Sequence, residues 1–127
     1  MIAIDTSAIM AILLNEQEAD ACIAAIEAEE DIVISSATLA ETLIVAGRRN
    51  IGAEAISLID GLGLEVVSVT PASAKRVADA YAHWGKGVHP AGLNFGDCFA
   101  YEVAKEHDCP LLFVGDDFSQ TDIDGVL

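Results

Sequence analysis

The sequence predicts an α/β protein whose mostly parallel sheet is covered by helices on both faces. Short apolar segments with strand character alternate with longer helical segments, which is typical of βαβ units. Hydrophobic residues make up 53% of the chain, and the excess is Ala, Ile, Leu and Val rather than aromatic residues, as expected for helices packed on a buried sheet. The length of 127 residues allows one substantial core, so we expect a single domain over residues 1–127.

The first half of the chain supplies two strands and three helices. The apolar run at 2–5 predicts a buried strand, and an Ala/Ile/Leu-rich helix follows to about residue 14. Residues 16–30 predict an amphipathic surface helix, because apolar residues recur there at spacings of three and four. A second strand is expected at 31–36 and a second long helix at 37–49.

Further elements follow in the same alternating order. A helix is expected over 53–62, with Ala55, Ile56 and Ile59 facing inward, and then a strand over 64–70. Pro71 suits a first helical position. The remaining segments are a helix over 71–84, a Gly-rich loop over 85–92, a helix over 95–107, a strand over 109–115 and a tail that could add a short edge strand.

Cysteine use and hydropathy favour a cytoplasmic protein. Cys22, Cys98 and Cys109 show neither disulfide nor zinc-ligand spacing, so we expect reduced thiols in or near the core. No apolar run reaches the roughly 18 residues of a membrane span, and we therefore expect no membrane association.

Acidic residues are placed where the predicted strands and helices meet. Asp5 ends the first strand, Glu41 lies early in the helix after the second strand, and Asp97 opens the helix before the last strand. Asp116 and Asp117 follow that last strand directly. Because ligands of such folds collect at the carboxyl ends of the strands, we expect these side chains to converge on one edge of the sheet.

Each acidic residue also has a purely structural interpretation as a cap or a turn residue. Such residues commonly cap helices and form turns. It makes Asp5 a helix N-cap, Thr38 with Glu41 a capping box, Asn94 with Asp97 another capping box, and Asp116 with Asp117 a turn.

The apolar surroundings of Glu41 and Asp97 favour a metal site. Buried carboxylates are costly to ionise without a compensating cation, and crowded carboxylates raise one another's pKa. The chain has only 6 basic residues against 21 acidic ones. A divalent cation would neutralise such a cluster, and an all-oxygen ligand set suits Mg²⁺ or Mn²⁺ rather than zinc.

Four segments together resemble a known family. They are "IAIDTSAI", "SSATLAE", "LNFGDCFAYEVAKEHDCPLLFVGDDF" and the near-terminal "TDI". The chain thereby resembles the PIN-domain nucleases, and more narrowly the VapC-type toxins of bacterial toxin–antitoxin pairs, from residue 2 to about residue 124. The resemblance implies a three-layer α/β/α sandwich and endonucleolytic cleavage of RNA in an acidic pocket that binds Mg²⁺ or Mn²⁺.

The resemblance also implies roles for individual residues. The acidic set falls on Asp5, Glu41, Asp97 and Asp117, with Asp116 as the second choice for the fourth member because "VGDDF" is shorter than the commoner version of this motif. We expect Asp5 and Asp97 to bind the metal directly and Glu41 and Asp117 to act through water. Thr6 and Ser7 match the pair of hydroxyl residues that follows the first aspartate in this family. One of these hydroxyls could hold a metal-bound water or a phosphate oxygen.

The net charge of −15 opposes binding of a polyanion such as RNA at long range. Charges separated by more than about 8 Å are screened at physiological salt, so cations at contact distance can still bind phosphate. The candidate RNA contacts are Arg48, Arg49, Lys86 and Lys105. The loop around Lys86 and His89 could shape substrate choice.

A toxin of this type would be expected to form a homodimer and to be inhibited by a VapB-type antitoxin that inserts an arginine among the carboxylates. The apolar segments "IMAILL" and "LIVAG" could provide the groove for it, although each could equally fill the core. The alternative function is a non-catalytic PIN-fold module that binds protein. Such a module should neither need Mg²⁺ nor lose activity when Asp5 or Asp97 becomes Asn.

Overall fold

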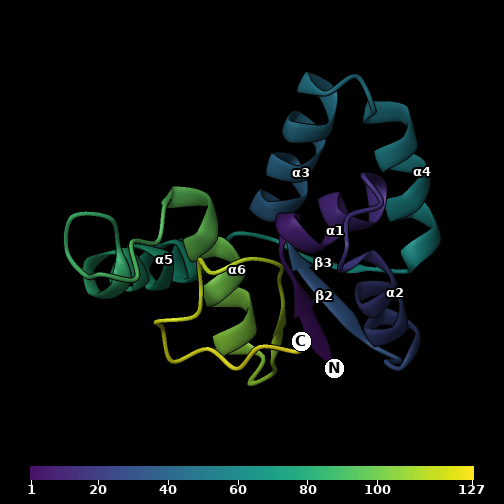
Figure 1. Ribbon diagram of the computed structural model, residues 1–127. Helices are drawn as coiled ribbons and strands as arrows, with labels where there is room; N and C mark the ends of the chain where they lie inside the picture. Colours follow the sequence, from purple (N-terminus) through teal and green to yellow (C-terminus); the bar gives the residue numbers. More distant parts are fainter.

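The computed structural model describes residues 1–127 and is built around a four-stranded sheet (Figure 1). All its strand pairs are parallel, and the spatial order is β3-β2-β1-β4. The strands are β1 (Ile2–Ile4), β2 (Ile32–Ser35), β3 (Glu65–Val67) and β4 (Leu111–Leu112). The predicted α/β class with a parallel sheet is therefore confirmed.

Six helices surround the sheet. They are α1 (Thr6–Leu13), α2 (Ala19–Glu27), α3 (Ser36–Arg48), α4 (Gly52–Leu62), α5 (Pro71–Trp84) and α6 (Phe95–Glu106). Every helix predicted from the sequence is present, and Pro71 occupies the first position of α5. None of these helices is long and apolar enough to span a membrane.

Alternating strand residues divide the core between the two faces of the sheet. Ala3, Val33 and Leu111 pack against α5 and α6, in a cluster that includes Val77 and Val103. The intervening strand residues pack against α1 and α2, with α4 alongside; they are Ile2, Ile4, Ile32, Ile34 and Leu112. Because parallel strands bury both faces, helices cover each side of the sheet, and Figure 1 shows α5 and α6 on one side with α1, α2 and α4 on the other.

Some sequence predictions are corrected. The last strand is only two residues long rather than seven, because its partner β1 ends at Ile4 and the Val114 N–H bonds to the Ser7 hydroxyl instead. The tail forms a single bridge between Gly125 and Leu111 and no edge strand. Ile56, expected to face inward, is 52% exposed, whereas Ala55 is buried. Helix α4 therefore contributes a narrower apolar stripe than its sequence predicts.

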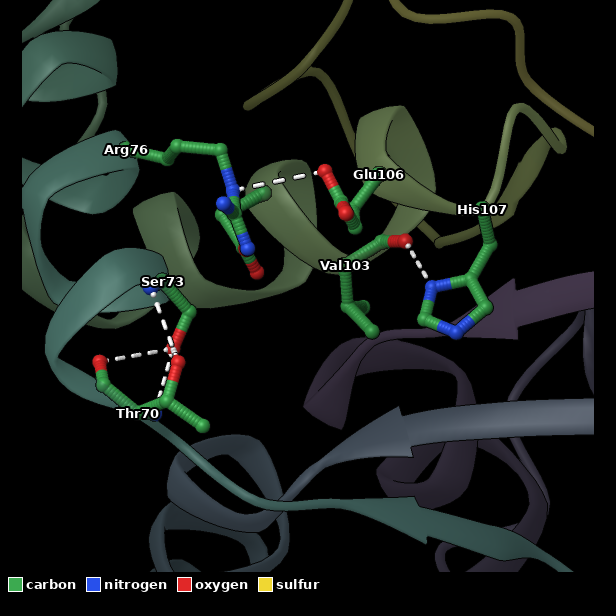
Figure 2. A network of polar contacts seen from close by, with 7 residues as sticks. Thr70, Ser73, Arg76, Val103, Glu106 and His107 are labelled. Atoms are coloured by element: carbon green, nitrogen blue, oxygen red, sulfur yellow. Dashed lines mark hydrogen bonds and ion pairs between the residues drawn. The ribbon is translucent and has the colours of Figure 1, made fainter.

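Polar contacts tie α5 to α6. Arg76 Nε lies 3.0 Å from Glu102 Oε1 and 3.4 Å from Glu106 Oε2, and a Thr70–Ser73 capping box begins α5 (Figure 2). These ion pairs link α5 to the helix that carries Asp97.

Candidate acidic active site

The carboxyl edge of the sheet carries the predicted acidic residues. Asp5 follows β1 and caps α1, and Glu41 lies in the second turn of α3, which follows β2 directly. Asp97 is in the first turn of α6, and Asp117 lies in the turn region after β4. Four segments that are distant in sequence therefore bring acidic residues to the same edge of the sheet.

Asp5 is held by Ser7. The Ser7 backbone N–H and hydroxyl donate to Asp5 Oδ2 at 3.1 and 2.7 Å, so the N-cap interpretation of Asp5 is correct. Val114 N–H donates to Ser7 Oγ at 3.0 Å and thereby connects Asp5 to the end of β4. Burial raises the pKa of Asp5, which is 5% exposed, and the charge of Glu41 raises it too, while the bonds from Ser7 lower it.

Asp97 is both a capping residue and a member of the acidic cluster. Asn94 N–H donates to Asp97 Oδ2 at 3.0 Å, and Asp97 N–H donates to Asn94 Oδ1 at 2.8 Å, which makes the predicted capping box. Burial raises the pKa of Asp97 from 3.8 to about 7, although the Asn94 N–H acts in the opposite direction. The negative charges of Asp5, Asp117 and Glu41 raise it as well. These carboxylates therefore lie close enough to repel one another.

Glu41 is not a capping-box residue, because α3 begins three residues earlier than that interpretation requires. Ser35 is the N-cap, and its hydroxyl accepts from Ala37 N–H at 3.2 Å. Glu41 Oε1 instead accepts a 2.7 Å hydrogen bond from the Thr6 hydroxyl. This bond joins α1 to α3 and leaves no helix-capping role for the Glu41 carboxylate.

Two residues around Glu41 were not identified from the sequence. Thr42 Oγ1 lies 2.9 Å from Thr6 Oγ1, and the Glu41 carboxylate rests against the backbone of Gly96. The sequence signal for the second contact was Gly96 itself, in the first turn of a predicted helix. Glycine disfavours helix formation, so its presence there indicates a close contact or another special requirement.

The two candidates for the fourth acidic residue are Asp116 and Asp117. The charge of Asp117 raises the pKa of Asp97. The Asp116 carbonyl accepts from Ser119 N–H and Oγ at 3.1 and 2.7 Å in an exposed turn. The buried ring of Phe118 anchors this segment. The effect of its charge on Asp97 is consistent with Asp117 as the fourth acidic residue.

The hydroxyls predicted for Thr6 and Ser7 face carboxylates. The Thr6 hydroxyl donates a hydrogen bond to Glu41, and the Ser7 hydroxyl donates one to Asp5. In this arrangement both hydroxyls orient acidic side chains.

The candidate RNA-binding cations are scattered. Arg48 shares an apolar cavity of about 510 Å³ with Glu41, Gly96 and Phe95. Lys105 forms an ion pair with Asp122 at 3.1 Å, away from the acidic site. Arg49 and Lys86 are exposed without an ion pair, at the end of α3 and in the 85–92 loop. Of the four, Arg48 is the one that borders the cavity beside Glu41.

The donor set fits a hard divalent cation with few protein ligands. No three Asp, Glu, His or Cys side chains are arranged to hold a metal ion together. Mg²⁺ commonly uses one or two carboxylates and keeps several waters, and Asp5 and Asp97 are two buried carboxylates whose mutual repulsion raises the pKa of Asp97. Their oxygen chemistry suits Mg²⁺ or Mn²⁺.

The raised pKa of Asp97 predicts how stability depends on pH. A carboxyl with a pKa of 3.8 when unfolded and about 7 when folded binds its proton more tightly in the folded state. Its stabilising contribution is therefore complete below pH 4 and lost as the pH rises toward 7. Without metal, we expect the free energy of unfolding to fall on the order of 2–3 kcal/mol between pH 5 and 8.

Urea denaturation of the metal-free chain at both pH values measures this change. Asp97→Asn should reduce the pH dependence, and the part that remains should include the contribution of Asp5, whose pKa is also raised by burial. An equal slope in both proteins would contradict an elevated pKa at Asp97.

The parallel sheet, its helical layers and the acidic edge define a class of α/β proteins with a carboxylate site at the strand ends. Comparison with known families identifies the family, with residues 2–124 matching the PIN domain. The chain belongs to the PIN domain family.

Individual relatives narrow this result. The chain is 42% identical over 123 residues to ribonuclease VapC30 of Mycobacterium tuberculosis, with 94% of each chain covered. Among solved structures it shares the fold of VapC20 of Mycobacterium tuberculosis, a sarcin–ricin loop cleaving toxin, at a TM-score of 0.76 and 17% identity over 97% of this chain and 96% of that one. The structure of VapBC2 of Rickettsia felis bound to a promoter DNA fragment matches at a TM-score of 0.72 and 18% identity. The match covers 98% of this chain and 97% of that one. The chain is therefore similar to the VapC-type members of the family.

Proposed function

We propose that this protein is a metal-dependent endoribonuclease and the toxin of a VapBC-type toxin–antitoxin pair. The observation that carries the proposal is the set of carboxylates at one sheet edge, where three of them raise the pKa of the fourth, Asp97. The names of the relatives, which are VapC ribonucleases, support the same activity.

Asp5 and Asp97 would hold Mg²⁺ or Mn²⁺. When bound, the cation neutralises charge at the phosphoryl group and lowers the pKa of water, so that water can lose a proton and attack at neutral pH. Glu41 and Asp117 orient the attacking water, and either carboxylate can accept its proton. Ser7 holds Asp5 in place while the second oxygen of its carboxyl group remains free of side-chain hydrogen bonds.

The RNA substrate would approach along the cavity that Arg48 shares with Glu41. A guanidinium there can pair with a backbone phosphate next to the one that is cleaved. Arg49 and Lys86 would contribute weaker, exposed contacts, and the ion pair of Lys105 with Asp122 makes Lys105 the least favoured of the four. The low number of such cations is consistent with weak intrinsic affinity for RNA.

An antitoxin would inhibit the enzyme by covering the same cavity. Ile44 and Val45, from the predicted "LIVAG" segment, line it beside Glu41, so an apolar segment can pack there while an arginine reaches the carboxylates. The "IMAILL" segment is mostly buried, but Ile12 lines a second groove with residues of α2 and α4. We propose that the antitoxin is of the VapB type.

A homodimer is part of the proposal. Phe95 is 74% exposed and borders both the cavity beside Glu41 and an apolar cavity between α5 and α6. A large aromatic side chain in that position suits an interface better than free solvent. The proposed setting is the cytoplasm, where cellular RNA is accessible.

Sequencing of RNA 5′ ends after induction tests the proposed activity. Cells expressing the chain should show new RNA ends at defined sites within minutes, and cells expressing the Asp97→Asn variant should not. Growth arrest without new ends, or the same ends with both proteins, would contradict an endoribonuclease at this site.

A further inference from the structure

We infer that two uncharged residues, Thr42 and Gly96, fix the Glu41 carboxylate, Thr42 through the Thr6 hydroxyl and Gly96 by leaving space for it. Thr42 is a positioning residue in this arrangement and does not itself contact the site. The effect on cleavage rests on the proposed function, whereas the effect on the orientation of Glu41 does not.

A chain of buried hydroxyls leads to Glu41. Thr6 Oγ1 lies 2.7 Å from Glu41 Oε1 and 2.9 Å from Thr42 Oγ1. Thr42 Oγ1 lies 2.9 Å from the Thr38 carbonyl oxygen, whereas Thr6 Oγ1 is 3.4 Å from that oxygen. Thr42 is completely buried and Thr6 is 9% exposed, so water cannot easily replace these partners.

Proton counting shows what Thr42 contributes. Each hydroxyl has one proton, and Thr6 can donate to Glu41 only if it does not donate elsewhere. The Thr42 hydroxyl can donate either to the Thr38 carbonyl or to Thr6. When it donates to Thr6, the Thr6 proton is directed to Glu41. Without the Thr42 hydroxyl, Thr6 loses this donor and its proton can turn to the Thr38 carbonyl oxygen, 3.4 Å away, so the bond to Glu41 is lost part of the time.

Gly96 lies on the opposite side of the same carboxylate. A Cβ added at position 96 would overlap Glu41 Oε2 and lie 2.9 Å from Glu41 Cδ. Residue 96 is in the first turn of α6, next to Asp97. Any side chain there would displace the Glu41 carboxylate from its present position.

The Thr42→Val variant keeps the shape of the side chain and removes the hydroxyl. We expect kcat for RNA cleavage to fall about tenfold, as for the loss of one hydrogen bond to a charged group, with KM nearly unchanged. Thr42→Ser should restore kcat to within about twofold because it restores the donor. If the Thr42→Val and Thr42→Ser variants cleave RNA at the same rate, the hydroxyl chain does not position Glu41.

The Gly96→Ala variant tests the other side. Ala favours helix over Gly, so we expect the melting temperature to be retained or raised while kcat falls at least tenfold. Gly47→Ala is the matched control, because Gly47 lies in α3 and a Cβ there meets nothing within 4 Å. Equal activity of both Gly→Ala variants would contradict the inference.

Nuclear magnetic resonance gives a readout that needs neither RNA nor metal. The Gly96 amide signal should move in Glu41→Gln, because the charged group beside it is removed, and it should move in Thr42→Val but little in Thr42→Ser. An unmoved Gly96 signal in Thr42→Val would overturn the inference even if cleavage is never observed. Conversely, absence of cleavage by the unaltered chain, with these shifts present, would contradict only the proposed function.

Discussion

Replacing Asp97 by Asn is expected to reduce metal-dependent RNA cleavage by about a hundredfold to a thousandfold or more, while the metal-free chain becomes more stable at pH 8. Asn has nearly the same size and retains a side-chain oxygen that can accept from Asn94 N–H, so the start of α6 should be preserved. The lost charge is one that burial and neighbouring carboxylates disfavour. Stability and activity should therefore change in opposite directions.

Cleavage of a fluorescent RNA in Mg²⁺ and urea denaturation of the same preparations measure the two effects. Asp108→Asn is the control, because Asp108 is exposed and lies just beyond the other end of α6. It should change neither quantity appreciably. Undiminished cleavage by Asp97→Asn would remove Asp97 from the mechanism.

Local patterns were enough to predict the helices. The periodicity of α2, the Pro71 start of α5 and the Asn94 start of α6 all depend on residues within one or two turns. The extent of β4 could not be obtained in this way. Its apolar sequence continues through Val114, but its partner β1 ends at Ile4 and Val114 N–H bonds to Ser7 Oγ, more than a hundred residues away.

For the acidic site too, local sequence patterns predicted the capping roles but not the contacts between distant segments. That Asp5 and Asp97 serve as caps could be expected from their spacing to Ser7 and Asn94. The false capping box at Thr38 arose because "SSAT" offers several residues that can cap, and the chain uses Ser35, the last residue of β2. The contact between Glu41 and Gly96 depends on the tertiary packing of two helices, which no local pattern contains.

Replacing Asp5 by Asn is expected to weaken Mn²⁺ binding by at least tenfold to a hundredfold. Asp5 is oriented by two bonds from Ser7 to one carboxylate oxygen, so its direction is already set before any ion arrives. Asn would retain the N-cap through its side-chain oxygen but would remove the negative charge that a divalent cation requires. Its burial means that no neighbouring exposed carboxylate can easily take its place.

Calorimetric titration of the metal-free chain with Mn²⁺ measures this affinity, and Asp20→Asn, an exposed substitution on α2, is the control. The titration also contains a test of mechanism, since a carboxyl must lose its proton before it binds metal. With the pKa of Asp97 near 7, Mn²⁺ should bind more weakly at pH 6 than at pH 8 and should release protons at pH 6. An isotherm that Asp5→Asn leaves unchanged would mean that the cation is held elsewhere, whereas a weakened isotherm without the pH dependence would retain Asp5 as a ligand and exclude Asp97.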